Sequence, residues 1–476
     1  MSTISQQQRE EAKSELIFRL NDRPSLAQSL IAALQHSAAI FIGIITPPIV
    51  VAGALGLDSS MKSYLISMSL LVSGLATFVQ CRKIGPVGSG LLSIQGTSFT
   101  FLATVTAIGL WAQSNGASQE QMIATIAGTA LLGSSVEIIF SRFIPLLQKI
   151  ITPLVSGIIV LLIGINLIAV GIRDVGGGAY VYANLPEQFA SWENLMLAGI
   201  VLLSIVLFNR IKNKWFRMGS IFFGMLVGYI VAVFIGKVDF SVLTSMNVFT
   251  VPVPFKFGLR IAGPYIIPMM LLFLITTVET MGDLTATSMI SGEPVEGEVY
   301  LKRISGGVLA DGVNSAISSC LNSFPVTTFS QNNGVIQMTG VASRYIGFFI
   351  AGFLALFGIF PIIGGVFSVI PYPVIGGAVV VLAGTIAAGG IRIISTSILD
   401  RRGVLIIAIA LGLGLSVILY PEILKNFSPF FKSMFSSPIT TGGLTAIFLN
   451  IILPRELRNR SLSRDPSKDM MGQQEL

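Results

Sequence analysis

The chain has 476 residues, of which 53% are hydrophobic and only 11% are charged. Soluble domains carry about 25% charged residues, so the composition indicates an integral membrane protein rather than a soluble enzyme. A formal net charge of +7 could point to a nucleic-acid partner in a soluble protein. Here the basic residues lie in short loops between apolar segments, where they set orientation in the bilayer, and no nucleic-acid partner is expected.

Apolar runs long enough to cross about 30 Å of hydrocarbon occur seven times in each half of the chain. They lie near residues 29–55, 63–81, 91–110, 122–140, 151–172, 194–209 and 218–236, and near 264–284, 304–323, 325–342, 345–364, 372–391, 403–420 and 439–454. With the N-terminus inside, 23 basic residues fall in inner segments and 7 in outer ones. This bias predicts that the polar ends, 1–28 and 455–476, are both cytoplasmic.

An odd number of crossings in each half inserts the second half upside down relative to the first. The sequence therefore predicts an all-α polytopic protein with a seven-plus-seven inverted repeat. The third and tenth segments are both interrupted by small and polar residues, SIQGTSFTF at 93–101 and TTFSQNNGVIQMTG at 327–340. Irregular backbone is tolerated at membrane depth only where protein or a cavity surrounds it. We expect short β-like stretches there, each leading into a half-helix that faces a substrate site.

Three carboxylates lie within or close against apolar runs: Glu279, Asp283 and Asp311. Such charges cost roughly 2.5–3.5 kcal/mol on insertion scales and usually face a cavity or substrate path. Glu279 and Asp283 are four residues apart and share a helix face, so their mutual repulsion favours binding of a proton by one of them. Asp283 could instead cap the following turn. Asp311 could couple protons or hydrogen-bond the neighbouring unwound backbone.

Amide side chains cluster in the tenth segment at Gln331, Asn332 and Asn333. Amides both donate and accept hydrogen bonds, which suits the lactam edge of an oxidised purine, but some of them could simply satisfy broken backbone. Phe99 in the third segment is a candidate stacking platform. The only histidine, His36, lies in the first segment; it could titrate, but we favour a packing role with a neighbour at the site as its partner.

Motifs for other chemistry are missing from the sequence. One histidine cannot form H-E-x-x-H, and there is no G-x-x-x-x-G-K-[ST] loop for nucleotide hydrolysis. The two cysteines, Cys81 and Cys320, have no metal-ligand spacing. We therefore expect neither enzymatic activity nor a metal or other cofactor.

The chain resembles the nucleobase–ascorbate transporter family over nearly its whole length, and three stretches carry the resemblance most specifically. FSQNNGVIQMTGVASRY at 329–345 is similar to its signature, and VETMGDLTAT at 278–287 and GPVGSGLLSIQGTSF at 85–99 are similar to two further blocks. The resemblance is strongest to the bacterial xanthine permeases, which are proton symporters. It implies a core domain of 29–140 and 264–364, a gate domain of 151–236 and 372–454 that carries a homodimer interface, and an elevator-like movement between them.

The resemblance also assigns roles to individual residues. It implies substrate binding by Glu279 and Gln331, with Phe99 as the aromatic residue of the third segment and Asn332 affecting specificity. Asp311 would be the essential acid of the ninth segment, Asp283 a functionally important neighbour, and His36 a support of the site. Gln331 stands where uracil transporters carry Glu, which disfavours uracil. Ser98 stands where some xanthine permeases have Asn, so urate or other purines stay open.

These expectations combine into one leading hypothesis, proton-coupled uptake of xanthine across the bacterial inner membrane. A urate or broader purine permease of the same family is one alternative. An anion channel or exchanger of the same architecture is another, although a basic residue would then be expected where Gln331 stands. A non-transporting sensor would need a soluble output domain.

Overall fold

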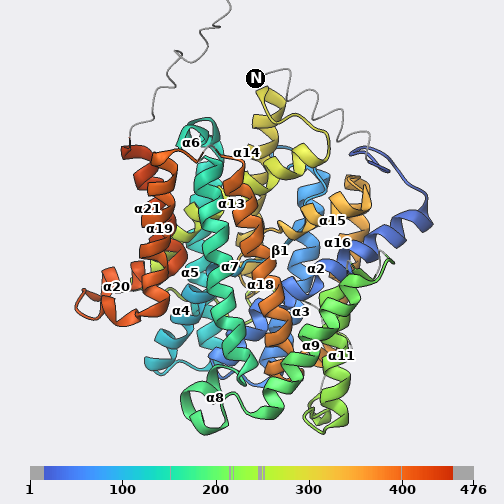
Figure 1. Cartoon of the computed structure of the whole chain (residues 1–476), viewed down its shortest axis with the longest axis vertical. Helices are drawn as coiled ribbons and strands as arrows, with labels where there is room; N and C mark the ends of the chain where they lie inside the picture. The colour runs from blue at the N-terminus through green and yellow to red at the C-terminus, as the bar shows by residue number, and fades with distance from the viewer. Residues whose placement is uncertain are drawn as a thin grey trace, which may run out of the picture.

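The computed structural model of the chain describes residues 16–150, 152–213, 216–217, 219–244, 249, 252–397 and 399–453. The described chain is predominantly helical (Figure 1), which confirms the predicted helical class. Eight of the described helices are long and apolar enough to span a membrane, or nine if the bent pair α16 and α17 counts as one span. The fourteen-segment inverted repeat stays a prediction.

A first group of helices packs around α3 and α5. It comprises α2 (Leu26–Ala54), α3 (Ser59–Arg82), α4 (Leu102–Ser114), α5 (Gln119–Phe140), α13 (Ile266–Ile290), α14 (Gly297–Cys320), α15 (Gln331–Thr339), α16 (Arg344–Ile359) and α17 (Pro361–Ser368). Two buried strands, β1 (Gln95–Thr97) and β2 (Val326–Thr328), lie inside this group. Segments far apart in the sequence are therefore neighbours, because α3 packs on α16 and α5 packs on α14.

A second group packs around α7 and α18, which make the most extensive helix contact of the structure. It comprises α7 (Pro153–Val175), α9 (Trp192–Arg210), α11 (Ser220–Phe234), α18 (Tyr372–Ser395), α19 (Arg401–Leu419) and α21 (Pro438–Ile452). The other helices among the described residues are short: α6 (Ile144–Ile150), α8 (Ala179–Asn184), α12 (Ser241–Thr244), α20 (Pro429–Phe435), η1 (Phe99–Phe101), η2 (Ser141–Phe143), η3 (Pro186–Gln188), η4 (Gly263–Tyr265) and η5 (Pro421–Leu424).

The apolar run near 345–364 is not one straight helix. The axes of α16 and α17 differ by 78°, with the break at Phe360, whose backbone is extended (φ −103°, ψ 94°). Pro361 follows directly, and a proline disfavours helical backbone at the residue before it. Pro361 itself is well accommodated in the first turn of α17, so the local sequence both ends one helix and starts the next.

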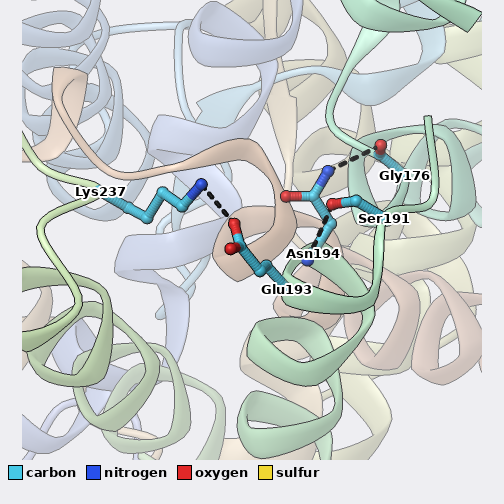
Figure 2. Close-up of polar contacts among 5 residues, drawn as sticks. All are labelled: Gly176, Ser191, Glu193, Asn194 and Lys237. Carbon is cyan, nitrogen blue, oxygen red and sulfur yellow. Dashed lines mark hydrogen bonds and ion pairs between the residues drawn. The ribbon is translucent and has the colours of Figure 1, made fainter. Parts of the chain in front are cut away.

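Polar contacts between helix ends join elements of the second group (Figure 2). The Asn194 side chain at the start of α9 donates to the Gly176 carbonyl at the end of α7 over 3.0 Å. Ser191 caps the same turn by accepting from the Asn194 backbone N–H at 3.4 Å. Lys237, just after α11, forms an ion pair with Glu193. Because this pair is exposed, its contribution to stability is small, and the Asn194 bond is the more specific connection.

Glycines on one face of α7 allow its backbone to approach α18 closely. Gly157, Gly164 and Gly171 recur every seven residues, and all three are buried against α18. A Cβ atom added at Gly164 would lie 2.4 Å from the Ala387 backbone nitrogen, and one added at Gly390 would lie 2.4 Å from the Leu161 nitrogen. Small residues of this kind are the usual means of close helix packing in membranes, where dispersion contacts replace the hydrophobic driving force.

We expect Gly164→Ala to destabilise the protein by about 1–3 kcal/mol, the usual cost of overpacking, because its methyl group has no space against the α18 backbone. Gly199→Ala on α9 is the matched control, since no heavy atom lies within 4 Å of its added Cβ. Thermal denaturation of the two purified variants in detergent tests this. Equal melting temperatures for Gly164→Ala and the control would contradict the packing argument.

Candidate functional site

The site is built where the two interrupted segments meet. Strands β1 and β2 pair antiparallel, with Gln95 opposite Thr328, Gly96 opposite Thr327 and Thr97 opposite Val326. Two further bonds extend the pairing, from Ser98 N to the Pro325 carbonyl and from Phe329 N to the Ile94 carbonyl, each 2.9 Å. Unwound backbone inside a membrane protein must satisfy its polar groups internally. Here each interrupted segment supplies partners for the other.

Side chains of neighbouring helices complete this hydrogen bonding. Ser315 on α14 bonds both backbone groups of Val326, donating to the carbonyl at 3.0 Å and accepting from the N–H at 3.1 Å. Thr77 on α3 accepts from the Gln95 N–H at 3.0 Å. The Asn314 amide donates to the Gln95 side-chain oxygen at 2.6 Å. Helices α3 and α14 thus hold the strands in place. The residues that follow each strand, from Ser98 and from Phe329, therefore begin at fixed positions.

Asp311 on α14 is fully buried and accepts hydrogen bonds from side chains of α3, α13 and β2. The Gln80 amide donates to it at 3.1 Å, the Thr327 hydroxyl at 3.2 Å, and the Thr280 hydroxyl also donates to it. Gln80 is itself fixed, because its amide donates to the Gly307 carbonyl at 2.9 Å. Asp311 therefore bonds side chains around the strands, and not the unwound backbone itself.

Asp283 on α13 is 3% exposed and is bound by the segment after β2. The Thr328 hydroxyl donates to it at 3.1 Å and the Ser330 hydroxyl at 2.6 Å. No salt bridge among the described residues includes Asp283, Asp311 or Glu279. These carboxylates are held by neutral donors alone, so they can change protonation state without breaking an ion pair.

Glu279, one turn before Asp283, is only half-buried and has a single described hydrogen bond, from the Thr100 hydroxyl at 2.9 Å. It lines a small, partly open cavity of about 20 Å³ between the two helix groups. The first group contributes Phe99, Glu279, Thr327, Thr328, Phe329, Ser330 and Gln331, and the second contributes Val160, Ile163 and Ile386. Every polar group of the wall comes from the first group, while α7 and α18 provide only apolar side chains.

Two aromatic rings form one side of this cavity. Phe99 and Phe329 are nearly parallel, with their ring centroids 6.5 Å apart and their planes inclined by 25°. Glycine is required beside them, because a Cβ at Gly96 would lie 2.6 Å from the Phe329 ring and one at Gly43 would lie 2.9 Å from it. The cavity therefore combines flat apolar surfaces with a carboxylate and an amide, a combination that fits a planar, polar-edged ring.

His36 and Asn332 lie directly behind this wall and hydrogen-bond each other, with 2.8 Å between His36 Nδ1 and Asn332 Oδ1. The Asn332 amide donates to the Leu92 carbonyl at 2.7 Å. Since that bond leaves Oδ1 as the acceptor, His36 is the donor through Nδ1. Asn332 satisfies unwound backbone, as one of the interpretations of the amide cluster predicts, and joins it to α2. Asn333 accepts from the Thr287 hydroxyl at 2.6 Å.

The predicted site residues thus occupy one region in two layers. Glu279, Gln331 and Phe99 line the cavity, whereas Asp283, Asp311, His36 and Asn332 form hydrogen bonds behind it. Ser98 is 3% exposed, does not line the cavity, and its hydroxyl has no hydrogen-bond partner among the described residues.

Three buried polar residues of this region were absent from the predicted site. Gln80 and Thr100 bond the carboxylates Asp311 and Glu279, and Glu137 is a further fully buried acid on α5. Glu137 lies inside the apolar run 122–140, so the general rule for charges at membrane depth could have found it. Thr100 carried no comparable signal, since threonine is common in membrane helices.

We expect Asn332→Ala to lower thermal stability, because it leaves the Leu92 carbonyl and the His36 ring buried without their partners. An unsatisfied buried polar group costs about 1–3 kcal/mol. Gln337→Ala on the same helix is the control, since Gln337 is exposed and bonds only the Arg392 side chain among the described residues. The melting temperatures of both purified variants decide this, and an Asn332→Ala protein as stable as the control would disprove the bridging role.

The chain is similar in sequence to a family of permeases and similar in fold to a membrane transporter of known structure. Residues 27–423 match the model of a family described as the permease family. The chain is 47% identical to the xanthine permease XanP of Escherichia coli K12 over 93% of its own length and 96% of that protein, and 44% identical to XanQ of the same strain over 95% and 96%. The structure superimposes on the murine anion transporter Slc26a9 in its inward-facing state, with a TM-score of 0.60, 11% identity, and coverage of 90% of this chain and 68% of that one.

Proposed function

This chain belongs to that permease family, the nucleobase–ascorbate transporters, and from its site we propose that it imports xanthine together with protons. The observation that carries the proposal is the cavity in which Glu279, Gln331 and the Phe99 ring meet between two helix groups. The two relatives named as xanthine permeases support the same substrate. In this proposal Glu279 and Gln331 bind the edge of the purine, and the apolar side chains of α7 and α18 close over it.

The chemistry of the two polar groups favours a purine with adjacent N–H and C=O groups. An ionised Glu279 only accepts hydrogen bonds, whereas Gln331 both donates and accepts. Xanthine presents N–H donors beside carbonyl acceptors along one edge and can satisfy both side chains. Adenine carries an amino group and an unprotonated ring nitrogen where xanthine carries C=O and N–H, so in the same pose its amino group would face the Gln331 donor and its ring nitrogen the Glu279 acceptor, leaving them unpaired at a cost of about 1–3 kcal/mol. Hypoxanthine lacks the 2-oxo group and should bind more weakly than xanthine for a similar reason.

Proton coupling is supported by the buried carboxylates behind the cavity. Asp283 and Asp311 are bound by hydroxyl and amide donors and by no described cation. Their charges repel one another in a poorly solvated environment, which favours taking up a proton. A proton bound there would lower the cost of moving the loaded site through the membrane, and its release inside would favour substrate release.

We further propose that transport is an elevator-like movement of the first helix group against the second. In this proposal the moving core comprises residues 29–140 and 264–364, and the gate comprises residues 151–236 and 372–454. The two halves of the chain form a seven-plus-seven inverted repeat, and the protein is a homodimer in the bacterial inner membrane. The placement of the cavity between the two helix groups is compatible with such a movement.

An anion channel or exchanger is the alternative from another class, since the fold resembles that of an anion transporter. The cavity wall argues against it, because its described lining residues include the Glu279 carboxylate and no Lys, Arg or His. A carboxylate facing the cavity repels an anion unless it is protonated. A urate or broader purine permease would use the same binding chemistry. Only competition between purines for uptake distinguishes it from a xanthine permease.

The proposal predicts that cells expressing this protein accumulate radiolabelled xanthine, and that a protonophore abolishes the accumulation because the proton gradient drives it. Replacing sodium by choline should leave uptake unchanged. Unlabelled xanthine should compete fully and adenine poorly, with urate and guanine tested alongside them.

Sodium-dependent uptake would refute proton coupling. Adenine competing as well as xanthine would refute the described roles of Glu279 and Gln331, and faster uptake of an inorganic anion than of xanthine would favour the channel or exchanger.

Glu279→Gln keeps the shape of the side chain and removes its charge. We expect xanthine binding to weaken about tenfold or more, which corresponds to loss of a charge-assisted hydrogen bond of about 1.5–3 kcal/mol. Glu298→Gln on α14 is the matched control, since its carboxylate is exposed and pairs with Lys302 on the surface. Equilibrium binding to the purified proteins provides the measurement. Wild-type affinity in a well-folded Glu279→Gln variant would rule out Glu279 as the binding carboxylate.

A further inference from the structure

A fourth buried acid, Glu137, lies on α5 and takes no part in the hydrogen bonds described above. Its side chain is fully buried and faces α14, where a Cβ added at Gly312 would lie 3.2 Å from the Glu137 Cβ. Neither of its oxygens has a hydrogen-bond partner of normal geometry among the described residues. The Thr276 hydroxyl on α13 interacts with it, but that hydroxyl also donates to the Phe273 carbonyl at 3.1 Å.

A structural role does not account for an acid in this position. Glu137 lies within α5 rather than at its N-terminal cap, and no described cation pairs with it. Burying a carboxylate without a partner costs several kcal/mol, and a buried acid that keeps its proton still leaves a donor unsatisfied. A leucine or alanine would pack against α14 at lower cost. Intramembrane acids that lack structural partners usually act in substrate or proton pathways.

The groups that face Glu137 are all acidic. Glu137 interacts electrostatically with Asp311 on α14 and with Glu279 on α13, and Asp283 lies one turn beyond Glu279. Helix α4, which also packs on α5, has no titratable side chain, and Arg142 in η2 is exposed. Among the described residues no cation is paired with these acids, and several like charges in one buried cluster are costly when all are ionised at once. The two acids therefore compete to keep a proton.

Two hydroxyl groups of α13 lie near these acids, one close to Glu137 and the other at Asp311. Thr276, which interacts with Glu137, and Thr280, which donates to Asp311, are four residues apart and lie on the same face of the helix. Hydroxyl groups both donate and accept, so each can take a proton on one lone pair and release its own. Thr280 also lies 3.2 Å from the Thr327 hydroxyl. The hydroxyl near Glu137 and the hydroxyl at Asp311 are thus one helical turn apart, about 5–6 Å between Cβ atoms.

We propose that Glu137 is a proton-handling residue of the transport cycle, exchanging a proton with Asp311 through the hydroxyl groups of Thr276 and Thr280. In the exchange the O–H bond of the Glu137 carboxylic acid breaks and an O–H bond forms on Asp311, so the negative charge moves from Asp311 to Glu137. The inference rests on the proposed proton-coupled function. Glu137 acts through Asp311 and does not line the substrate cavity.

The test uses full-length protein in proteoliposomes and measures two quantities: exchange of radiolabelled xanthine at equal pH, and xanthine-evoked proton entry reported by a trapped pH-sensitive dye. Glu137→Gln keeps the volume and cannot carry the proton. We expect its exchange rate to stay within about threefold of wild type while proton entry falls at least tenfold. Glu137→Asp should restore part of the proton entry. Glu120→Gln, at the exposed start of α5, should match wild type in both measurements.

Unchanged proton entry in Glu137→Gln would overturn the inference and leave the proposed function intact. Absence of xanthine-evoked proton entry in wild-type protein would instead refute the proposed coupling itself. If Glu137→Gln does not yield folded protein, Thr276→Val takes its place, because it removes the connecting hydroxyl at nearly equal volume. A tenfold loss of proton entry in Thr276→Val supports the route, and wild-type proton entry in that variant excludes it.

Discussion

The structure depends on the need to satisfy unwound backbone in the middle of a membrane protein. Two segments leave the helical conformation, and neither could do so alone because lipid offers no hydrogen bonds. The antiparallel pairing of Gln95–Thr97 with Val326–Thr328 solves this for both at once. The pairing in turn determines where the polar helices must lie, because Ser315 and Thr77 bond strand residues directly. Strand pairing, helix placement and cavity geometry are therefore consequences of one constraint.

The carboxylates of this region differ in how fully their oxygens are occupied. Asp311 and Asp283 each accept at least two hydrogen bonds from neighbouring side chains, whereas Glu279 accepts one and lines the cavity. A carboxylate offers about four acceptor positions, so Glu279 retains more capacity for a ligand than either aspartate. Removing either aspartate would instead leave several buried hydroxyl groups without an acceptor. The difference supports the proposal that Glu279 contacts the ligand while the aspartates support the strands.

The two helix groups contribute unequal chemistry to the cavity. The first group provides every polar lining group, while the second provides Val160, Ile163 and Ile386. A movement of one group along the other would break dispersion contacts at the cavity but no hydrogen bond of its lining. Close packing of α7 with α18 through Gly164 and Gly390 makes the second group a suitable rigid surface for such a movement. The proposed elevator mechanism requires this combination of a polar moving site and an apolar fixed wall.

The sequence by itself determined the membrane class and the helical content, and it predicted most of the residues that the structure brings together at the candidate site. Charges and amides are expensive within apolar runs, so Glu279, Asp311 and Gln331 were visible without any coordinates. The interruptions at 93–101 and 327–340 were visible for a similar reason, because small and polar residues rarely fill a helix that faces lipid. The bend at Phe360 was predictable in principle from Pro361 but was hidden within a continuous apolar run.

Only the tertiary structure decided which of these residues line the cavity and which support it. Glu279 and Asp283 are one turn apart on the same helix, yet one contacts the cavity and the other bonds Ser330, and no local pattern distinguishes them. The pairing of His36 with Asn332 joins residues 296 positions apart. Hydrogen-bond partners are selected by the packing of distant helices, whose contacts depend on shape and distance in three dimensions. Residue type and spacing specify which interactions a side chain can make, and packing specifies the neighbour with which it makes them.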